Sequence, residues 1–147
     1  MLPKELPPHN LLEPASPEAI EEEERALNEA FPASLERFLQ AHNGGSFYGG
    51  MLRLFSVGAN REYRFRSRNQ VFAEQERFPS GCIAFATDGG MGLYCFDPAT
   101  RGTDGECDLF YWSWEERVRE PVGRTFEDFM HHLEARARLW WSEPDGE

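Results

Sequence analysis

The chain has 147 residues, a length that suits one domain, and 40% of them are hydrophobic, which excludes global disorder. Its formal net charge is −11, and because an acidic surface repels phosphate backbones, we expect no general nucleic-acid binding. No apolar run reaches the ~20 residues that a membrane span needs, and the N-terminus lacks a signal-peptide core, so we expect no membrane contact and a cytoplasmic protein.

Residues 1–15 are rich in proline and predict an extended arm, followed by a single domain over 16–141. Ser16 before Pro17 predicts a helix start, because serine caps a helix N-terminus and proline fits its first turn. The acidic run Glu21–Glu24 lies on this helix. It indicates a solvated face or, as a second hypothesis, a partner-binding surface.

A second short amphipathic helix is predicted after Pro32, with Leu35, Phe38 and Leu39 on its apolar side. We expect it to end at Asn43-Gly44-Gly45, because a glycine there can adopt the left-handed conformation that closes many helices. We interpret these three residues as a structural turn. The apolar residues of 51–57 then predict a buried strand.

Residues 58–80 have no single interpretation, although Asn60 could cap a helix. Within them, arginines alternate with aromatic residues over 61–68, the one basic region of the sequence. Such a pattern can bind single-stranded nucleic acid. Because the rest of the chain is strongly acidic, we favour internal pairing of these arginines with the glutamates.

The stretch FATDGGMGLYCFD at 85–97 has a glycine-rich centre that invites comparison with a phosphate-binding loop. A loop of that kind must run into a helix, whose N-terminal amides and dipole hold the phosphate. Here residues 82–86 and 93–96 both predict strands. We therefore interpret Asp88, Gly89 and Gly90 as a structural hairpin turn, since these residue types tolerate positive φ.

A further strand is predicted over 108–112, followed by a polar stretch to Gly123. Thr125-Phe126-Glu127-Asp128 resembles a capping box and predicts the start of a last helix, with a polar tail at 142–147. The apolar face of this helix consists of Phe126, Phe129, Met130, Leu133, Ala137 and Trp140. The predicted fold class is α/β (α+β): a single domain with a mixed or antiparallel central sheet of about four to six strands packed by helices.

Four tryptophans lie close to the C-terminus. We expect Trp112 and Trp140 to anchor the core, because each fits the pattern of its element, and consider Trp114 and Trp141 as surface candidates.

The sequence contains no recognisable catalytic or metal-binding motif. The cysteines Cys82, Cys95 and Cys107 form no CxxC pair, and His131 and His132 would point about 100° apart on a helix. No HExxH, GxSxG or P-loop pattern occurs. We therefore expect no metal, no cofactor and no enzymatic activity.

The order of the motifs resembles a known family. Phe31-Pro32, the helix LERFL, His42-Asn43-Gly44-Gly45, the strand and turn IAFATDGG, and a terminal helix TFEDF follow one another over about residues 17–137. This order is similar to the fungal cell-wall assembly regulator (Smi/Knr-type) family of the SUKH superfamily. The resemblance implies an α/β domain without known catalysis. Many bacterial members resemble immunity proteins that neutralise a cognate toxin, often a nuclease, whereas fungal members resemble signalling scaffolds.

The sequence is compatible with both roles, because both need only a binding surface for a protein partner. We favour an immunity protein with a basic toxin as partner, since acidic carboxylates and aromatic anchors suit the phosphate-binding face of a nuclease. A scaffold or regulatory interaction domain is the alternative, and a small-molecule binder or enzyme the remaining one. The hypothetical partner-binding residues are Asp97, Asp104, Glu106, Asp108, Trp112 and Trp114, with Glu21 and Glu22 as a second surface.

Overall fold

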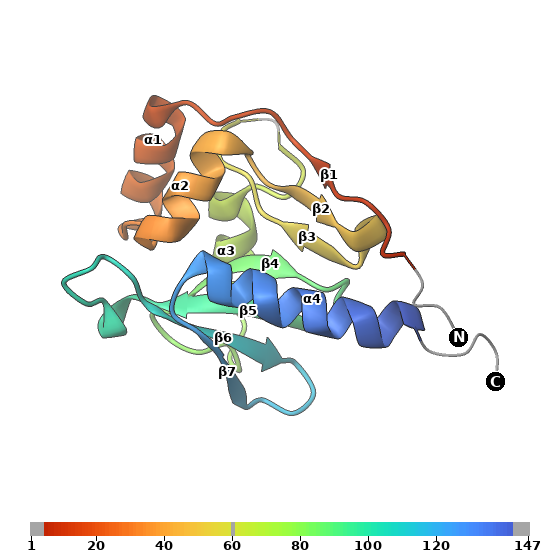
Figure 1. Cartoon of the computed structure of the whole chain (residues 1–147). Helices are drawn as coiled ribbons and strands as arrows, with labels where there is room; N and C mark the ends of the chain where they lie inside the picture. Colours follow the sequence, from red (N-terminus) through yellow and green to blue (C-terminus); the bar gives the residue numbers. More distant parts are fainter. Residues whose placement is uncertain (1–4, 60, 143–147) are drawn as a thin grey trace.

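The computed structural model describes residues 5–59 and 61–142 and shows one seven-stranded sheet with helices packed against it (Figure 1). The strands follow one another across the sheet in chain order, and every neighbouring pair is antiparallel. Asn60 and residues 143–147 of the predicted tail lie outside the described residues. No helix within the described ranges is long and apolar enough to cross a membrane.

Four α-helices and two short 3-10 helices accompany the strands. In chain order the elements are β1 (Asn10–Leu11), α1 (Pro17–Leu27), α2 (Ala33–Ala41), β2 (Gly45–Phe47), η1 (Tyr48–Gly50), β3 (Leu52–Leu54), α3 (Phe65–Ala73), β4 (Ile83–Thr87), β5 (Gly92–Asp97), η2 (Pro98–Thr100), β6 (Asp108–Ser113), β7 (Arg119–Gly123) and α4 (Phe126–Ser142).

The single α+β architecture is confirmed, but the predicted strand count of four to six was too low, and the sheet is purely antiparallel. The strands without a sequence signal are β1, β2 and β7. β1 comprises only two residues of the arm, and β2 comprises three. β7 is an edge strand whose side chains are exposed or half-buried, so it lacks the alternation that predicts a strand. Its Pro121 suits an edge, where a missing N–H leaves no gap inside the sheet.

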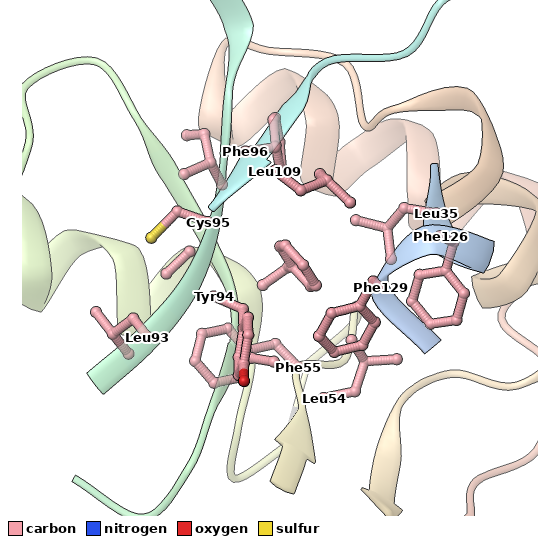
Figure 2. Packing of buried hydrophobic residues seen from close by; sticks show 14 of the residues in the cluster. Leu35, Leu54, Phe55, Leu93, Tyr94, Cys95, Phe96, Leu109, Phe126 and Phe129 are labelled. Atoms are coloured by element: carbon pink, nitrogen blue, oxygen red, sulfur yellow. The ribbon is translucent and has the colours of Figure 1, made fainter. Parts of the chain in front are cut away.

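One face of the sheet packs against α4. The ring of Phe129 is fully buried, with its centroid 5.0 Å from that of Phe85 and 5.1 Å from that of Tyr94. Phe126, one turn earlier, stacks on Phe38 of α2 at 4.4 Å. Figure 2 shows Phe129 between Tyr94 of β5 and Phe126, so this ring joins the sheet to the helical layer.

The opposite face carries a second aromatic group. Trp112 follows Tyr111 on β6 and therefore points to the other side of the sheet. Its ring lies 4.4 Å from Trp114 and 5.9 Å from Phe78, and Trp114 lies 6.0 Å from Phe72 of α3. Trp112 is only 2% exposed, as expected for a core anchor. Trp114 is half-buried.

The start of α4 has the predicted capping box. The N–H of Asp128 donates to Thr125 Oγ1 at 3.1 Å, and the N–H of Thr125 donates to Asp128 Oδ2, also at 3.1 Å. The expectation that Trp140 anchors the core was wrong, because its side chain is 63% exposed. Trp140 continues the apolar face, but the last turns of α4 extend past the strands that cover its first half (Figure 1). Trp141, not Trp140, packs against the core.

The Asn43-Gly44-Gly45 segment has a different role from the predicted helix cap. α2 ends at His42 in extended backbone, with φ −146°, so no left-handed residue closes it. Instead the Asn43 side chain pairs with the backbone of Val57, donating to its C=O at 2.9 Å and accepting from its N–H at 2.8 Å. Gly44, with φ +83°, then carries the chain past the backbone of Phe55 into β2.

The Asp88-Gly89-Gly90 segment joins β4 to β5. Gly89 and Gly90 have φ values of +98° and +110°, which only glycine adopts freely. Asp88 Oδ1 accepts a hydrogen bond from the N–H of Gly92 at 2.9 Å and so closes the turn. Because the turn runs into a strand and not into a helix, it has no helix N-terminus with which to hold a phosphate.

Candidate functional site

The acidic residues predicted to form a partner surface beside η2 have arginine partners. Asp97 Oδ2 lies 3.0 Å from the Arg119 guanidinium. Asp108 and Asp104 both face Arg124, at 2.6 and 3.6 Å. These arginines come from β7 and the segment after it, so the negative charge of the cluster is largely offset locally.

Two other residues of that hypothesis cannot face a partner, because they are buried. The Glu106 carboxylate accepts hydrogen bonds from the Ser34 N–H at 3.1 Å and from the Ser34 hydroxyl at 2.8 Å. The same hydroxyl accepts from the N–H of Phe126 at 2.7 Å, so Glu106 helps to tie α2 to the start of α4. Trp112 lies in the core described above. Both are therefore corrected from partner-binding to structural positions.

The acidic helix α1 pairs with the basic segment of 61–68, which confirms the favoured interpretation of that segment. Glu23 is completely buried, and its carboxylate accepts from Arg64 Nη2 at 3.0 Å and from the N–H of Arg66 at 2.8 Å. Glu22 lies 3.9 Å from the Arg66 guanidinium, and Glu21 lies 2.7 Å from Arg25. Glu21 and Glu22 remain exposed, but each already has a cation beside it.

A groove lies between the β6–β7 hairpin, the β4–β5 turn and α4, and we call it the hairpin groove. Its volume is about 860 Å³, within the size range of ligand-binding clefts. Its lining residues are Gly90, Met91, Tyr111, Ser113, Trp114, Glu115, Glu116, Glu120, His132 and Arg136. Of the residues predicted to bind a partner, the hairpin groove contains only Trp114.

Three lining residues of the hairpin groove, Tyr111, His132 and Arg136, belong to a cluster of interacting polar side chains that reaches into the core. The Tyr94 hydroxyl accepts from Arg136 Nη1 at 2.7 Å and lies 3.2 Å from His132 Nε2. The Tyr111 hydroxyl donates to Asp88 Oδ2 at 2.6 Å, and the Arg136 guanidinium lies over the Tyr111 ring, 5.1 Å from its centroid. Side chains of α4 are thereby held against β5 and β6.

Burial shifts the ionisation of the two tyrosines and of His132 in this cluster toward their neutral forms. It raises the pKa of Tyr94 to about 12, against the opposing effect of Arg136, and it is the largest cause of the raised pKa of Tyr111. It also lowers the pKa of His132, an effect that Arg136 reinforces and Glu120 opposes. His132 is therefore neutral at pH 7. No group of three or more metal-ligating side chains occurs among the described residues.

The lowered pKa of His132 predicts an acid-sensitive fold. In the unfolded chain this histidine binds its proton near pH 6.5, whereas in the folded chain it resists protonation until the pH is lower. The contribution of His132 to the free energy of unfolding is therefore fully present above pH 6.5 and falls as the pH drops below that value. Urea unfolding between pH 7.5 and 5 will show this fall, and His132→Gln will reduce it.

The neighbouring histidine provides the control for this prediction. His131 is exposed and lies beside His132 on α4, so His131→Gln is measured alongside as the matched substitution. If the unfolding free energy changes with pH in the same way in the wild type and in His132→Gln, then His132 contributes nothing to the acid sensitivity.

Sequence reasoning missed most of the hairpin groove because its residues come from three separate segments: the β4–β5 turn, the β6–β7 hairpin and the middle of α4. The one local signal was the run Trp114-Glu115-Glu116, an aromatic residue followed by two carboxylates.

One comparison places the chain among known sequences. The profile of the SMI1 / KNR4 family (SUKH-1) matches residues 14–132, which run from just before α1 to the first half of α4. The matched range includes the β4–β5 turn, the β6–β7 hairpin and His132, and it ends before Arg136. No curated protein matches the chain.

Proposed function

Because the chain belongs to the SMI1 / KNR4 family (SUKH-1), we propose that it is a non-catalytic protein-binding domain that acts as an immunity protein. In this role it binds and neutralises a cognate toxin, such as a nuclease, of a bacterial polymorphic toxin system. The family resemblance described above provides the class of function. We assign the binding of such a partner to the hairpin groove, on the charge of its lining residues.

The observation that carries the proposal is the set of free carboxylates on the β6–β7 hairpin. Glu115, Glu116 and Glu120 line the hairpin groove and are exposed. Within the part of the chain that the structure describes, none of them forms an ion pair, unlike Asp97 and Asp108. A nuclease binds its substrate backbone through lysines and arginines, and unpaired carboxylates are the groups that can block them.

The charge of the whole protein supports the same role. A formal net charge of −11 creates a field that attracts a basic partner and raises the rate of encounter, most strongly at low salt. A neutralising protein benefits from fast association, because free toxin acts during the time before capture.

The proposal is tested by identifying the partner and its toxicity. The tagged protein is captured from its own cells at modest salt, and the polypeptides that co-purify are identified by mass spectrometry. Each is then expressed in a bacterial host with and without this protein. We expect one basic polypeptide that stops growth when expressed alone and allows growth when co-expressed.

The alternative role gives a different result in the same experiment. A set of signalling or envelope proteins, none of which stops growth, would contradict the proposal and indicate a scaffold or regulatory interaction domain.

A further inference from the structure

The hairpin groove has walls of opposite charge. Its hairpin wall carries Glu115, Glu116 and Glu120, and its α4 wall carries Arg136 beside neutral His132. Among the described residues, no carboxylate lies within 4.0 Å of the Arg136 guanidinium. No cationic side chain of those residues lies within 4.0 Å of the carboxylates of the three glutamates. No ion pair between described residues therefore joins the two walls, and both keep charged groups with which a partner can pair.

Arg136 is held in place while most of its donors stay free. A guanidinium has five N–H donors, and the hydrogen bond to the Tyr94 hydroxyl uses one of them. Tyr94 is 1% exposed and belongs to the core, and the Tyr111 ring lies beneath the guanidinium. A cation fixed by two rings in this way has already lost part of its side-chain entropy, so it binds an acceptor at lower cost.

The apolar part of the hairpin groove suits the stem of a long cationic side chain. Met91 is 70% exposed at the rim, and the half-buried Trp114 is held by Trp112 at 4.4 Å. Lysine and arginine bury their aliphatic stems on such surfaces while the charged end reaches a carboxylate or an aromatic face.

From these features we propose that the hairpin groove binds one loop of the partner protein in a fixed orientation. A lysine or arginine of the loop lies across Trp114 and pairs with the glutamates of the hairpin wall, and a nearby carboxylate of the same loop pairs with Arg136. The inference rests on the proposed function for the protein that supplies the loop. It adds that recognition requires both signs of charge, and not acidity alone.

Arg136 separates this arrangement from general electrostatic attraction. If the acidic protein simply attracts any basic partner, Arg136→Gln makes the protein more negative and should strengthen binding. If Arg136 pairs with an acceptor in the loop, the same change weakens binding. The two accounts thus predict effects of opposite sign for one substitution.

The experiment uses a defined peptide and the full chain. Capped acetyl-Ser-Arg-Gly-Glu-Ser-amide is titrated into the ¹⁵N-labelled protein, and backbone amide and tryptophan indole shifts are followed by NMR. We expect the largest shifts at Gly90, Met91 and the Trp114 indole. Replacing the peptide glutamate with glutamine should weaken binding several-fold in the wild type and should have no effect in Arg136→Gln, which completes a double-mutant cycle.

Matched variants keep the test specific. Arg138 lies on the same helix and already pairs with Glu134 at 2.7 Å, so Arg138→Gln should retain the wild-type difference between the two peptides. Glu115→Gln combined with Glu116→Gln and Glu120→Gln should remove most of the binding. Glu74 and Glu76 are two exposed acids that directly follow α3 in the chain, and replacing both with glutamine should leave peptide binding unchanged. The amide spectra themselves report whether each variant is folded.

Three results would overturn the inference. They are chemical-shift changes at Glu74 and Glu76 as large as those at the groove residues, tighter peptide binding by Arg136→Gln than by the wild type, or equal affinity of the wild type for both peptides. Failure here is distinguishable from failure of the proposed function. If the groove variants protect cells from the toxic polypeptide as the wild type does, neutralisation stands and the groove assignment fails. If no toxic polypeptide is found but the double-mutant cycle shows coupling between Arg136 and the peptide glutamate, the groove assignment stands and the proposed immunity function is wrong.

Discussion

Replacing Glu23 with glutamine will lower the free energy of unfolding by about 3 kcal/mol, the lower end of the range for a broken buried ion pair. Glu23 is 0% exposed, and its two oxygens accept three hydrogen bonds from Arg64 and one from the N–H of Arg66. Glutamine keeps the shape but removes the charge. The Arg64 guanidinium, 17% exposed, would then lack its counter-charge in a poorly solvated place between α1 and α3.

The adjacent residue gives a matched control on the same helix. Glu22→Gln makes the same chemical change at a side chain that is 68% exposed and 3.9 Å from Arg66. Exposed pairs of this kind contribute about 0–1 kcal/mol, so its urea midpoint should stay close to that of the wild type. Equal effects of the two substitutions would show that the Glu23–Arg64 pair does not hold α1 to α3.

Gly44→Val will destabilise the fold by about 3 kcal/mol or more, for two reasons that add. A left-handed backbone costs a side-chain-bearing residue on the order of 1–3 kcal/mol, and Gly44 has φ +83°. A Cβ there would also lie 2.6 Å from the carbonyl oxygen of Phe55 and 2.8 Å from that of Leu54. Both contacts are to backbone, which cannot move without disturbing β3.

A second glycine separates the two causes. Gly50 has a similar φ of +93°, but no atom lies within 4 Å of its hypothetical Cβ. Gly50→Val therefore measures the backbone strain alone, and thermal unfolding should place it between the wild type and Gly44→Val. Equal melting temperatures for the two variants would contradict the role assigned to the close approach of Gly44 and Phe55.

The sequence predicted elements whose signals are local. Ser16 accepts from the N–H of Ala19 and begins α1, and the capping box begins α4, because a cap depends on residues three positions apart. Trp140 shows the limit of such reasoning. Helical periodicity gives the face on which a residue lies, but it does not show where the opposing sheet ends.

The candidate site was less predictable, because charge along the chain differs from charge in space. In the sequence, Asp97 and Asp108 look like part of a free acidic cluster, but the fold brings Arg119 of β7 and Arg124, which follows β7, beside them. In the sequence, the glutamates of the β6–β7 hairpin gave only the weak signal of the run Trp114-Glu115-Glu116, which matches no recognised motif. They became a candidate site only through the fold, which places them across from Arg136 without an ion pair among the described residues.

Inhibition of the captured toxic polypeptide by this protein is the most direct test of the proposed function. The purified protein is titrated against the purified polypeptide, and the toxic activity, such as nucleic-acid hydrolysis, is followed at modest salt. An immunity protein predicts a linear loss of activity that reaches completion at an equimolar ratio. Full activity in the presence of excess protein, with the complex formed, would contradict neutralisation and leave a binding domain of another kind.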